Sequence, residues 1–202
     1  AYTTWEDIEK LCKEAITYQM ASVCIPACYI KQVHNEFKDL TICTVVGFPL
    51  GYSSTEGKVT ETMQALKDGA SEIDMVLNLC DVKNKDYHKV EQEIAALKKA
   101  TGDHILKVII ETCYLTEEEK IALCDVVSRS RAEFIKTSTG FAGGGATLAD
   151  IRLFKKYVTG DTKIKAAGGI KSVADAEAFL AAGADRLGSS SLLAMLRQEI
   201  KQ

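Results

Sequence analysis

Two stretches of this sequence decide its fold: Phe134-Ile135-Lys136-Thr137-Ser138-Thr139-Gly140 and Lys163-Ile164-Lys165-Ala166-Ala167-Gly168-Gly169. Each carries a lysine on a short strand-like run and then breaks into small residues, as strands do where they end in a turn. A lysine becomes a nucleophile near neutral pH only if its pKa falls from about 10.4, and burial beside a second ammonium group lowers it. Lys136 and Lys165 therefore predict Schiff-base chemistry, with the pKa of Lys136 lowered.

Each lysine also has a structural alternative. Lys136 could be a solvated lysine at a strand end, but the hydroxyl residues and glycines that follow it favour an ordered site. The alternative is stronger for Lys165, because Lys163 and Lys171 lie nearby in the sequence. Its spacing from the glycine pair Gly168-Gly169 is what favours a functional role.

Short β-branched runs alternate with segments of helical periodicity along the whole chain. Strands are predicted at Ala21–Ile25, Thr41–Val46, Glu72–Leu77, Ile105–Ile110, Glu133–Thr137, Lys163–Ala167 and Asp185–Gly188. Such alternation implies a parallel sheet, because each return to the same sheet needs a right-handed crossover. The repeat of about 20–32 residues favours a (β/α)8 TIM barrel in the α/β class over an open doubly wound sheet.

Helix starts support this reading. Thr3-x-x-Glu6 and Thr116-x-x-Glu119 fit the capping box, in which a hydroxyl and a carboxylate each bind a free backbone N–H. Ser172 precedes a helix expected at Val173–Ala182 and closed by Gly183. The chain opens on a helix and only seven strands are counted, so we expect the first strand of the barrel to be missing from this chain.

Composition limits the classes of function. The 202 residues are 47% hydrophobic, which suits one domain over residues 1–202 with a full core. The formal net charge is −3 with basic residues scattered among acids, so no nucleic-acid partner is expected. No apolar run approaches the roughly 20 residues that span a bilayer, and the N-terminus lacks a signal-peptide layout. We expect a cytoplasmic protein with no membrane partner.

The seven cysteines are predicted to be reduced thiols of the core, because most lie in apolar periodic segments. Cys24-Ile25-Pro26-Ala27-Cys28 could form half of a metal site. No second cluster at zinc spacing accompanies it, and the three histidines are far apart. No metal is therefore expected.

Asp74 is the acidic residue inside an otherwise apolar predicted strand, Glu72–Leu77. A carboxylate there is costly unless it is paired. It could pair with a structural lysine such as Lys107, or it could take part in catalysis. The residues alone leave both readings open.

The last two predicted strands are followed by a candidate anion site. Gly168-Gly169 follows one strand, and Gly188-Ser189-Ser190-Ser191 follows the next and opens a helix predicted at Leu192–Gln198. Backbone amides, hydroxyls and a helix N-terminus suit phosphate, and barrels often bind it after strands seven and eight. Ordinary turn glycines and a serine helix cap are the structural alternative.

Five segments together carry a family resemblance: Glu72–Val76, Leu106–Thr112, Phe134–Gly140, Lys165–Gly169 and Arg186–Leu192. Cys24-Ile25-Pro26 and the run from Thr44 to Gly51 extend it over nearly the whole chain. The chain resembles the deoxyribose-phosphate aldolases. That resemblance implies a class I aldolase on a (β/α)8 barrel with no cofactor, which splits 2-deoxy-D-ribose 5-phosphate reversibly into acetaldehyde and D-glyceraldehyde 3-phosphate.

The resemblance also implies residue roles. Lys136 would form the imine, Lys165 would perturb its pKa, and Asp74 would handle protons with Lys165. The phosphate would be held by residues of the two loops after the last strands: Gly168, Gly169, Gly188, Ser190 and Ser191. Its substrates would be small sugar phosphates and aldehydes, and the outer helical faces leave a homodimer open.

The sequence departs from the family pattern in three places. The family's first strand, with its Asp-His-Thr segment, is expected before Ala1, so we expect this chain to be truncated. Phe141 stands where some relatives have a phosphate-binding lysine, which leaves the anion to amides, hydroxyls and Lys171. The end at Gln202 lacks the terminal tyrosine that some members use in proton transfer.

Two other classes remain open. A phosphate-binding barrel isomerase or synthase without an imine would keep the two anion-binding loops but would not need Lys136. A truncated, inactive barrel that only binds a sugar phosphate or a partner is the second alternative.

Overall fold

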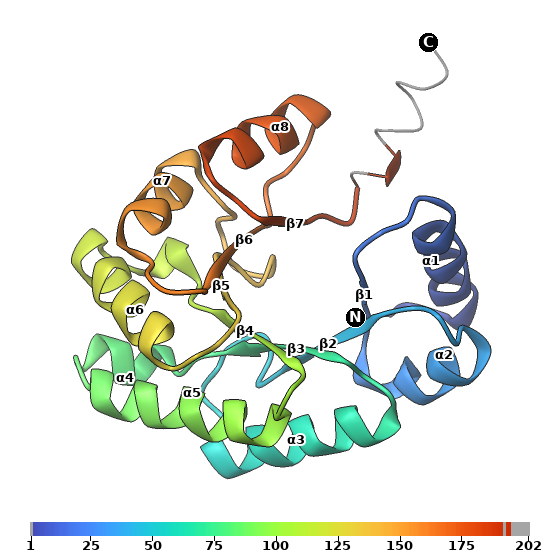
Figure 1. The fold of residues 1–202 in the computed structure, drawn as a ribbon, viewed down its shortest axis with the longest axis horizontal. Helices are drawn as coiled ribbons and strands as arrows, with labels where there is room; N and C mark the ends of the chain where they lie inside the picture. The colour runs from blue at the N-terminus through green and yellow to red at the C-terminus, as the bar shows by residue number, and fades with distance from the viewer. Residues whose placement is uncertain (1, 192, 195–202) are drawn as a thin grey trace.

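A computed structural model describes residues 2–191, 193 and 194 of the chain. Seven strands form one parallel sheet in sequence order. Their bounds are β1 Val23–Cys24, β2 Ile42–Val46, β3 Glu72–Val76, β4 Ile105–Ile109, β5 Phe134–Lys136, β6 Lys163–Ala167 and β7 Arg186–Gly188. Figure 1 shows the sheet curled about a central axis with the helices on its outer side.

One or two helices join each strand to the next, as the alternation in the sequence predicts. The α-helices are α1 Trp5–Thr17, α2 Ile30–Glu36, α3 Thr55–Asp68, α4 Leu79–Lys83, α5 Tyr87–Thr101, α6 Glu117–Arg129, α7 Leu148–Tyr157 and α8 Val173–Ala182. Two 3₁₀ turns, η1 Ala27–Tyr29 and η2 Thr112–Tyr114, precede α2 and α6. The predicted barrel class is confirmed, with seven barrel strands in the part that the structure describes.

All seven predicted strands are present, and six of them are one to three residues shorter than predicted. The backbone pairing continues beyond the assigned ends. The Ile25 N–H donates to Cys43 at 3.1 Å, and the Thr137 N–H donates to Lys165 at 3.1 Å. At Ile25 and Thr137, the predicted strand end is therefore the last residue that forms a hydrogen bond to the neighbouring strand, although the regular strand stops one residue earlier.

The first capping box is shifted by one residue from its predicted position. Thr4, not Thr3, caps α1, and its partner is Asp7 rather than Glu6. Aspartate reaches the N-cap amide from the third helical position as glutamate does. The predicted type of cap was therefore correct, but its position was wrong by one residue. The boxes at Thr116 and Glu119 and the cap at Ser172, with Gly183 closing the helix in a left-handed conformation, are confirmed.

The core lies between the sheet and the helices. Ile73, Leu106 and Ile135 are completely buried and come from three adjacent strands, and Phe154 of α7 is likewise buried. The next residue along each of the first two strands is polar and also fully buried: Asp74 in β3 and Lys107 in β4. Because side chains alternate along a strand, the apolar residues face the helices and these two charged residues face the barrel interior.

The prediction that the cysteines are core thiols is only partly correct. Cys12, Cys43 and Cys124 are buried, but the other four are exposed: Cys24, Cys28, Cys80 and Cys113. These four lie at the end of β1 or in turns and short helices near strand ends, where the periodic apolar pattern no longer points to the core. All seven are free thiols.

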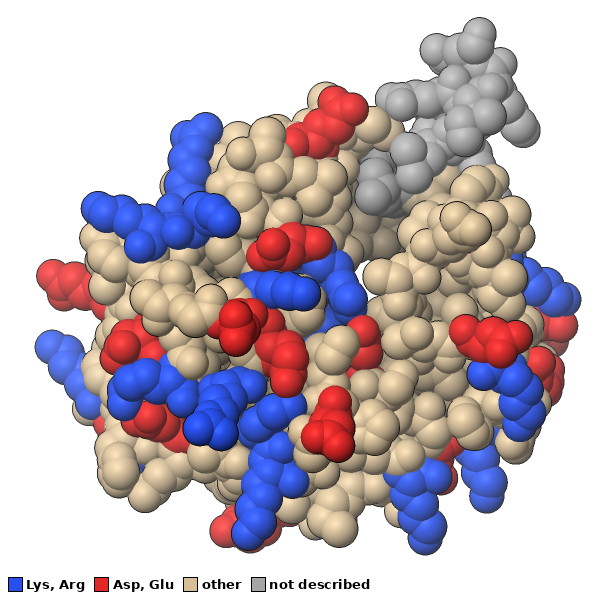
Figure 2. Space-filling model, viewed as in Figure 1, with Lys and Arg blue, Asp and Glu red and all other residues tan. Residues whose placement is uncertain are grey.

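Both signs of charge intermix on the face seen in Figure 2, which shows no broad basic surface there. Within the described residues, no helix combines the length and the apolar character needed to cross a membrane. The helix predicted at Leu192–Gln198 and the C-terminal Gln202 fall largely outside the described residues.

Candidate active site

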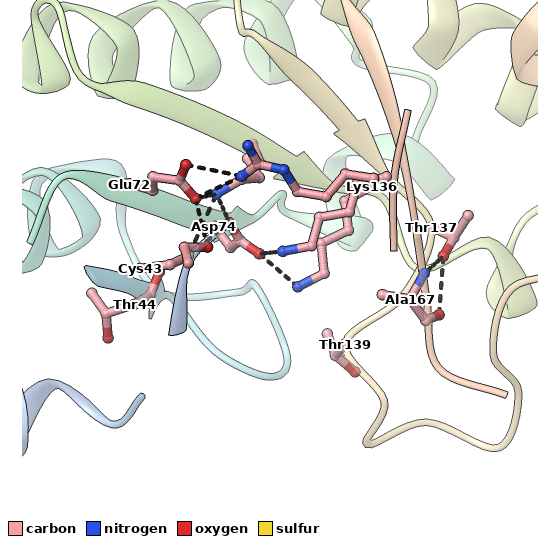
Figure 3. A network of polar contacts seen from close by, with 12 residues as sticks. Cys43, Thr44, Glu72, Asp74, Lys136, Thr137, Thr139 and Ala167 are labelled. Carbon is pink, nitrogen blue, oxygen red and sulfur yellow. Dashed lines mark hydrogen bonds and ion pairs between the residues drawn. The ribbon is translucent and has the colours of Figure 1, made fainter. Parts of the chain in front are cut away.

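The site centres on the carboxylate of Asp74, which is completely buried in β3. Its Oδ2 accepts hydrogen bonds from the Nζ atoms of Lys136 at 2.7 Å and Lys165 at 2.8 Å. Its Oδ1 accepts from Lys107 Nζ at 2.7 Å and from the thiol of Cys43 at 3.1 Å. Figure 3 shows two ammonium groups meeting one side of this carboxylate.

Strand register explains how three distant segments meet. Lys136 is the last residue of β5 and pairs with Lys165 in the middle of β6. Asp74 pairs with Lys107 of the neighbouring strand. Both lysines therefore lie in the strands predicted for them, Glu133–Thr137 and Lys163–Ala167. Lys165 sits deeper, and the two side chains converge on Asp74 from paired positions.

Both readings of Asp74 that the sequence left open are realised together. Oδ1 binds the fully buried Lys107, which is the structural pairing. Oδ2 faces the two lysines singled out for amine chemistry. One carboxylate thus ties the structural lysine to the candidate reactive lysines.

The electrostatics of the cluster favour the charged carboxylate. Burial alone would raise the pKa of Asp74, but the ammonium groups of Lys136, Lys165 and Lys107 outweigh it and hold that pKa well below its usual range. Asp74 is therefore an anion throughout the neutral range.

The pKa of Lys136 is raised, which contradicts the lowering expected from the sequence. Burial lowers it, but the negative charge of Asp74 at 2.7 Å raises it by more. Repulsion from Lys165 alone would lower this pKa, but the Asp74 anion contacts both lysines. In the resting site, Lys136 is thus held as an ammonium group.

A second buried carboxylate, that of Glu72, also binds cations of this cluster. Glu72 of β3 accepts from Arg186 at 2.9 Å with each oxygen and binds Lys107 at 2.7 Å. Lys107 therefore bridges two buried acids, and although burial lowers its pKa, Asp74 and other neighbouring groups raise it above the ordinary value. Lys107 acts as a structural counter-ion.

Replacing Lys107 with methionine should lower the free energy of unfolding by about 3 kcal/mol, because it removes the fully buried cation that contacts both Asp74 and Glu72. Urea denaturation at neutral pH measures this. Lys83→Met is the matched control, since Lys83 is 44% exposed and its bridge to Glu119 should contribute less than about 1 kcal/mol. Equal destabilisation of the two variants would contradict the role given to Lys107.

The loop after β5 is held in place by Glu111. This residue adopts a left-handed conformation with φ of +51°. Its carboxylate accepts from the Thr139 N–H at 3.1 Å and from the Thr139 hydroxyl. Thr137 exchanges hydrogen bonds with the backbone of Ala167, accepting at 3.0 Å and donating at 3.1 Å. These contacts order the segment that follows Lys136.

The predicted anion-binding loops lie side by side. Gly168 and Gly169 follow β6 with φ of +75° and +77°, where side chains are strained. Gly188 ends β7, and a Cβ there would lie 3.3 Å from the Cε of Lys165. The Ser191 hydroxyl donates to the Ile170 carbonyl at 3.5 Å, a bond from one loop to the other. Ser190 is exposed in the loop after β7.

Phe141, the residue expected from the resemblance to stand in place of a lysine, puts an aromatic ring in the loop after β5. Its side chain is 66% exposed, and its ring meets Phe48 edge-on with centroids 5.1 Å apart. The pair joins the loop after β5 to the loop after β2. Lys171, named from the sequence as an alternative cation, is exposed in the loop after β6.

Sequence reasoning missed three residues of the site: Cys43, Glu72 and Glu111. Each contacts a residue that was singled out or the loop that follows it. Strand alternation together with the β2–β3 register could have found Cys43, because Cys43 pairs with Glu72 and so lies on the same face of the sheet as Asp74. Glu111 follows β4 in an irregular conformation, so no periodic pattern marked it.

A curled parallel sheet with lysines and a carboxylate gathered in its interior defines a barrel enzyme with an amine-bearing site. The model of the DeoC/LacD family aldolases matches residues 1–198. The chain is 62% identical over 200 residues to a deoxyribose-phosphate aldolase of Clostridium botulinum (strain Alaska E43 / Type E3), covering 98% of this chain and 90% of the relative.

Solved structures agree with this match. One described as "QR15, an Aldolase" has a TM-score of 0.93 and 37% identity, covering 98% of this chain and 90% of that chain. A deoxyribose phosphate aldolase from Aeropyrum pernix, described as tetrameric, has a TM-score of 0.88 and 28% identity, covering 100% of this chain and 86% of that chain. This chain belongs to the DeoC/LacD aldolase family, and its members are lyases.

Proposed function

We propose that this protein is a deoxyribose-phosphate aldolase that acts through an imine on Lys136. It splits 2-deoxy-D-ribose 5-phosphate reversibly into acetaldehyde and D-glyceraldehyde 3-phosphate. The observation that carries the proposal is the convergence of Lys136 and Lys165 on one oxygen of the buried Asp74. The family match over residues 1–198 supplies the reaction class.

The chemistry needs a neutral amine. The Nζ atom of Lys136 attacks the substrate aldehyde carbon, and loss of water from the adduct leaves an iminium. A base then takes the proton of the C3 hydroxyl as the C2–C3 bond breaks, and that electron pair moves into the iminium to form an enamine. Protonation at C2 and hydrolysis release acetaldehyde and regenerate the amine.

Asp74 and Lys165 suit the proton transfers of this sequence. The iminium restores a positive charge where the Lys136 ammonium was, and Lys165 and Lys107 keep the Asp74 anion paired at the stages where that nitrogen is neutral. Lys165 lies on the same carboxylate oxygen and carries protons within reach of that position. A water between these groups and the substrate can relay a proton to the reacting atoms.

We assign the substrate phosphate to the paired loops after β6 and β7. Gly168, Gly169 and Gly188 have no side chains to block an anion, and the hydroxyls of Ser190 and Ser191 offer hydrogen bonds. The contact from Ser191 to Ile170 supports this assignment, because it holds the two loops together. Binding at this remote end would orient the reacting aldehyde toward Lys136.

We further propose that residues 1–202 act as one aldolase domain in the cytoplasm and assemble as a homodimer. The family match over most of the chain supports the single domain, and the tetrameric relative supports self-association. Light scattering of the purified protein tests the dimer, and a monomer mass would contradict it.

Borohydride trapping tests the proposed function. Acetaldehyde is added to the folded protein, borohydride reduces any imine, and peptide mass spectrometry locates the ethyl group. We expect that group on Lys136. An ethyl group on exposed lysines alone would leave a phosphate-binding barrel whose chemistry does not use an imine.

A further inference from the structure

Two thiols lie together beside the lysine cluster. Cys24 of β1 and Cys43 of β2 are paired positions on neighbouring parallel strands. Their sulfur atoms and a carboxylate oxygen of Asp74 all lie within 4.8 Å of one another. Neighbouring strands run about 4.8 Å apart, inside the range of Cα separations that disulfides span. The two sulfurs can therefore bond without a change of strand register.

The charges around these thiols favour a thiolate over a metal ion. The described ion pairs of the site join two carboxylates, Asp74 and Glu72, to four cationic groups: Lys107, Lys136, Lys165 and Arg186. This excess of positive charge opposes a divalent cation at the two sulfurs. It stabilises an anion there instead.

The two thiols differ in acidity. The neighbouring Cys43 thiol and the ammonium groups of Lys136 and Lys165 lower the pKa of Cys24 to about 7, against the opposing negative charge of Asp74. The proximity of Cys24, together with burial and the charge of Asp74, raises the pKa of Cys43 well above its usual value. Cys24 is thus the nucleophilic thiol, and Cys43 beside it is the resolving thiol.

We propose that Cys24 and Cys43 form a reversible disulfide when the protein meets a peroxide, and that this bond suppresses the lysine site. The effect on activity rests on the proposed aldolase function, whereas the bond itself does not. Cys24 lies beside the amine that an aldehyde must reach, so a molecule as small as hydrogen peroxide can reach it by the same route.

The chemistry balances with one peroxide for each bond. The Cys24 thiolate attacks one peroxide oxygen, the O–O bond breaks, and the leaving hydroxide takes up a proton to become water. Cys24 is then a sulfenic acid. The Cys43 sulfur attacks the Cys24 sulfur, the S–O bond breaks, and the hydroxyl leaves as a second water with the Cys43 proton. Both sulfurs are oxidised and the peroxide is reduced.

The disulfide would act on the site through Asp74. Cys43 gives its thiol hydrogen bond to Asp74 Oδ1 at 3.1 Å, and the S–S bond removes that proton. It also removes the negative charge of the Cys24 thiolate beside Lys136. Both changes disturb the charge balance on which the amine depends. We expect turnover to fall about tenfold, the scale of one hydrogen bond lost to a charged group.

The test treats the whole protein with hydrogen peroxide, and follows it by peptide mass spectrometry and aldolase assay. We expect a cross-link between the Cys24 and Cys43 peptides with the loss of two hydrogens. Dithiothreitol should reverse both the cross-link and the loss of turnover. In the Cys43→Ser variant, which keeps a hydroxyl donor to Asp74, Cys24 should instead gain oxygen atoms and not recover fully.

Cys80→Ser is the matched control, because Cys80 is an exposed thiol on α4 away from the lysine cluster. It should form the cross-link as the unmodified protein does. Oxygen added to Cys24 while Cys43 stays free in the unmodified protein would overturn the proposal. A cross-link without loss of turnover would overturn its regulatory half, and a protein with no aldolase activity even when reduced would count against the proposed function alone.

Discussion

The Lys136→Leu variant should fold and lose retro-aldol turnover by about 10⁵-fold or more, the order of loss that follows removal of a covalent nucleophile. Leucine fits a position that is only 6% exposed. It leaves Asp74 paired with Lys165 and Lys107, so no buried charge is left alone. The loss should therefore be chemical, with the melting temperature close to that of the unmodified protein.

The assay is cleavage of 2-deoxy-D-ribose 5-phosphate, with the aldehyde products measured directly. Lys163→Leu is the control, because Lys163 begins the neighbouring strand β6 and is exposed. It should retain turnover. Comparable rates for the two variants would rule out an imine on Lys136, and the phosphate-binding barrel without an imine would become the better explanation.

The fold could be predicted from local patterns because the strands are short and the helices that follow β2 to β6 in the described residues begin at a side-chain cap. The segment Lys163–Ala167 was located to the residue, and the helix after Ser172 began and ended as expected. Caps and apolar periods are local properties, so a single sequence records them. The shifted capping box at Thr4 shows the limit, since two neighbouring threonines carry the same signal and only one adopts the extended cap conformation.

The sequence predicted which residues form the site, but it did not predict the direction in which the pKa of the key lysine shifts. Lys136, Lys165 and Asp74 meet as expected, yet the pKa of Lys136 moves in the opposite direction. The direction of this pKa shift depends on which charged group lies closest to Lys136. The closest group is set by strand register and sheet curvature, not by the type of residue. Cys43 was missed because its contact with Asp74 joins two neighbouring strands, β2 and β3, and a pattern along either strand alone does not record it.

The raised pKa of Lys136 has a consequence for catalysis. Only the small neutral fraction of this lysine can attack an aldehyde near pH 7, so imine formation should speed up as the pH rises toward the pKa. The group responsible is Asp74, whose negative charge outweighs the effect of burial. Removing that charge should separate the nucleophilic step from the later proton transfers.

We expect the Asp74→Asn variant to form the trapped ethyl adduct at lower pH than the unmodified protein while its turnover falls by about 10²–10⁴-fold. Asparagine keeps the shape but not the charge. Burial and the ammonium of Lys165 then lower the pKa of Lys136, so at any fixed pH more of the amine is neutral. Turnover falls because the anion that pairs with the iminium and helps to relay protons is gone. Borohydride trapping across a pH series, with turnover measured in parallel, records both effects.

Asp150→Asn is the matched control, because Asp150 on α7 is also a buried acid paired with a lysine, Lys120, at 2.6 Å. It should lose stability without moving the pH dependence of trapping. Asp74→Asn should lose stability as well, since three buried ammonium groups lose their shared anion. In the unmodified protein the lowered pKa of Asp74 contributes stability above pH 3.8 that disappears as the pH falls through its folded value. That acid-dependent part should be absent from the variant. A trapping midpoint that stays in place, or rises, would show that Asp74 does not set the protonation of Lys136.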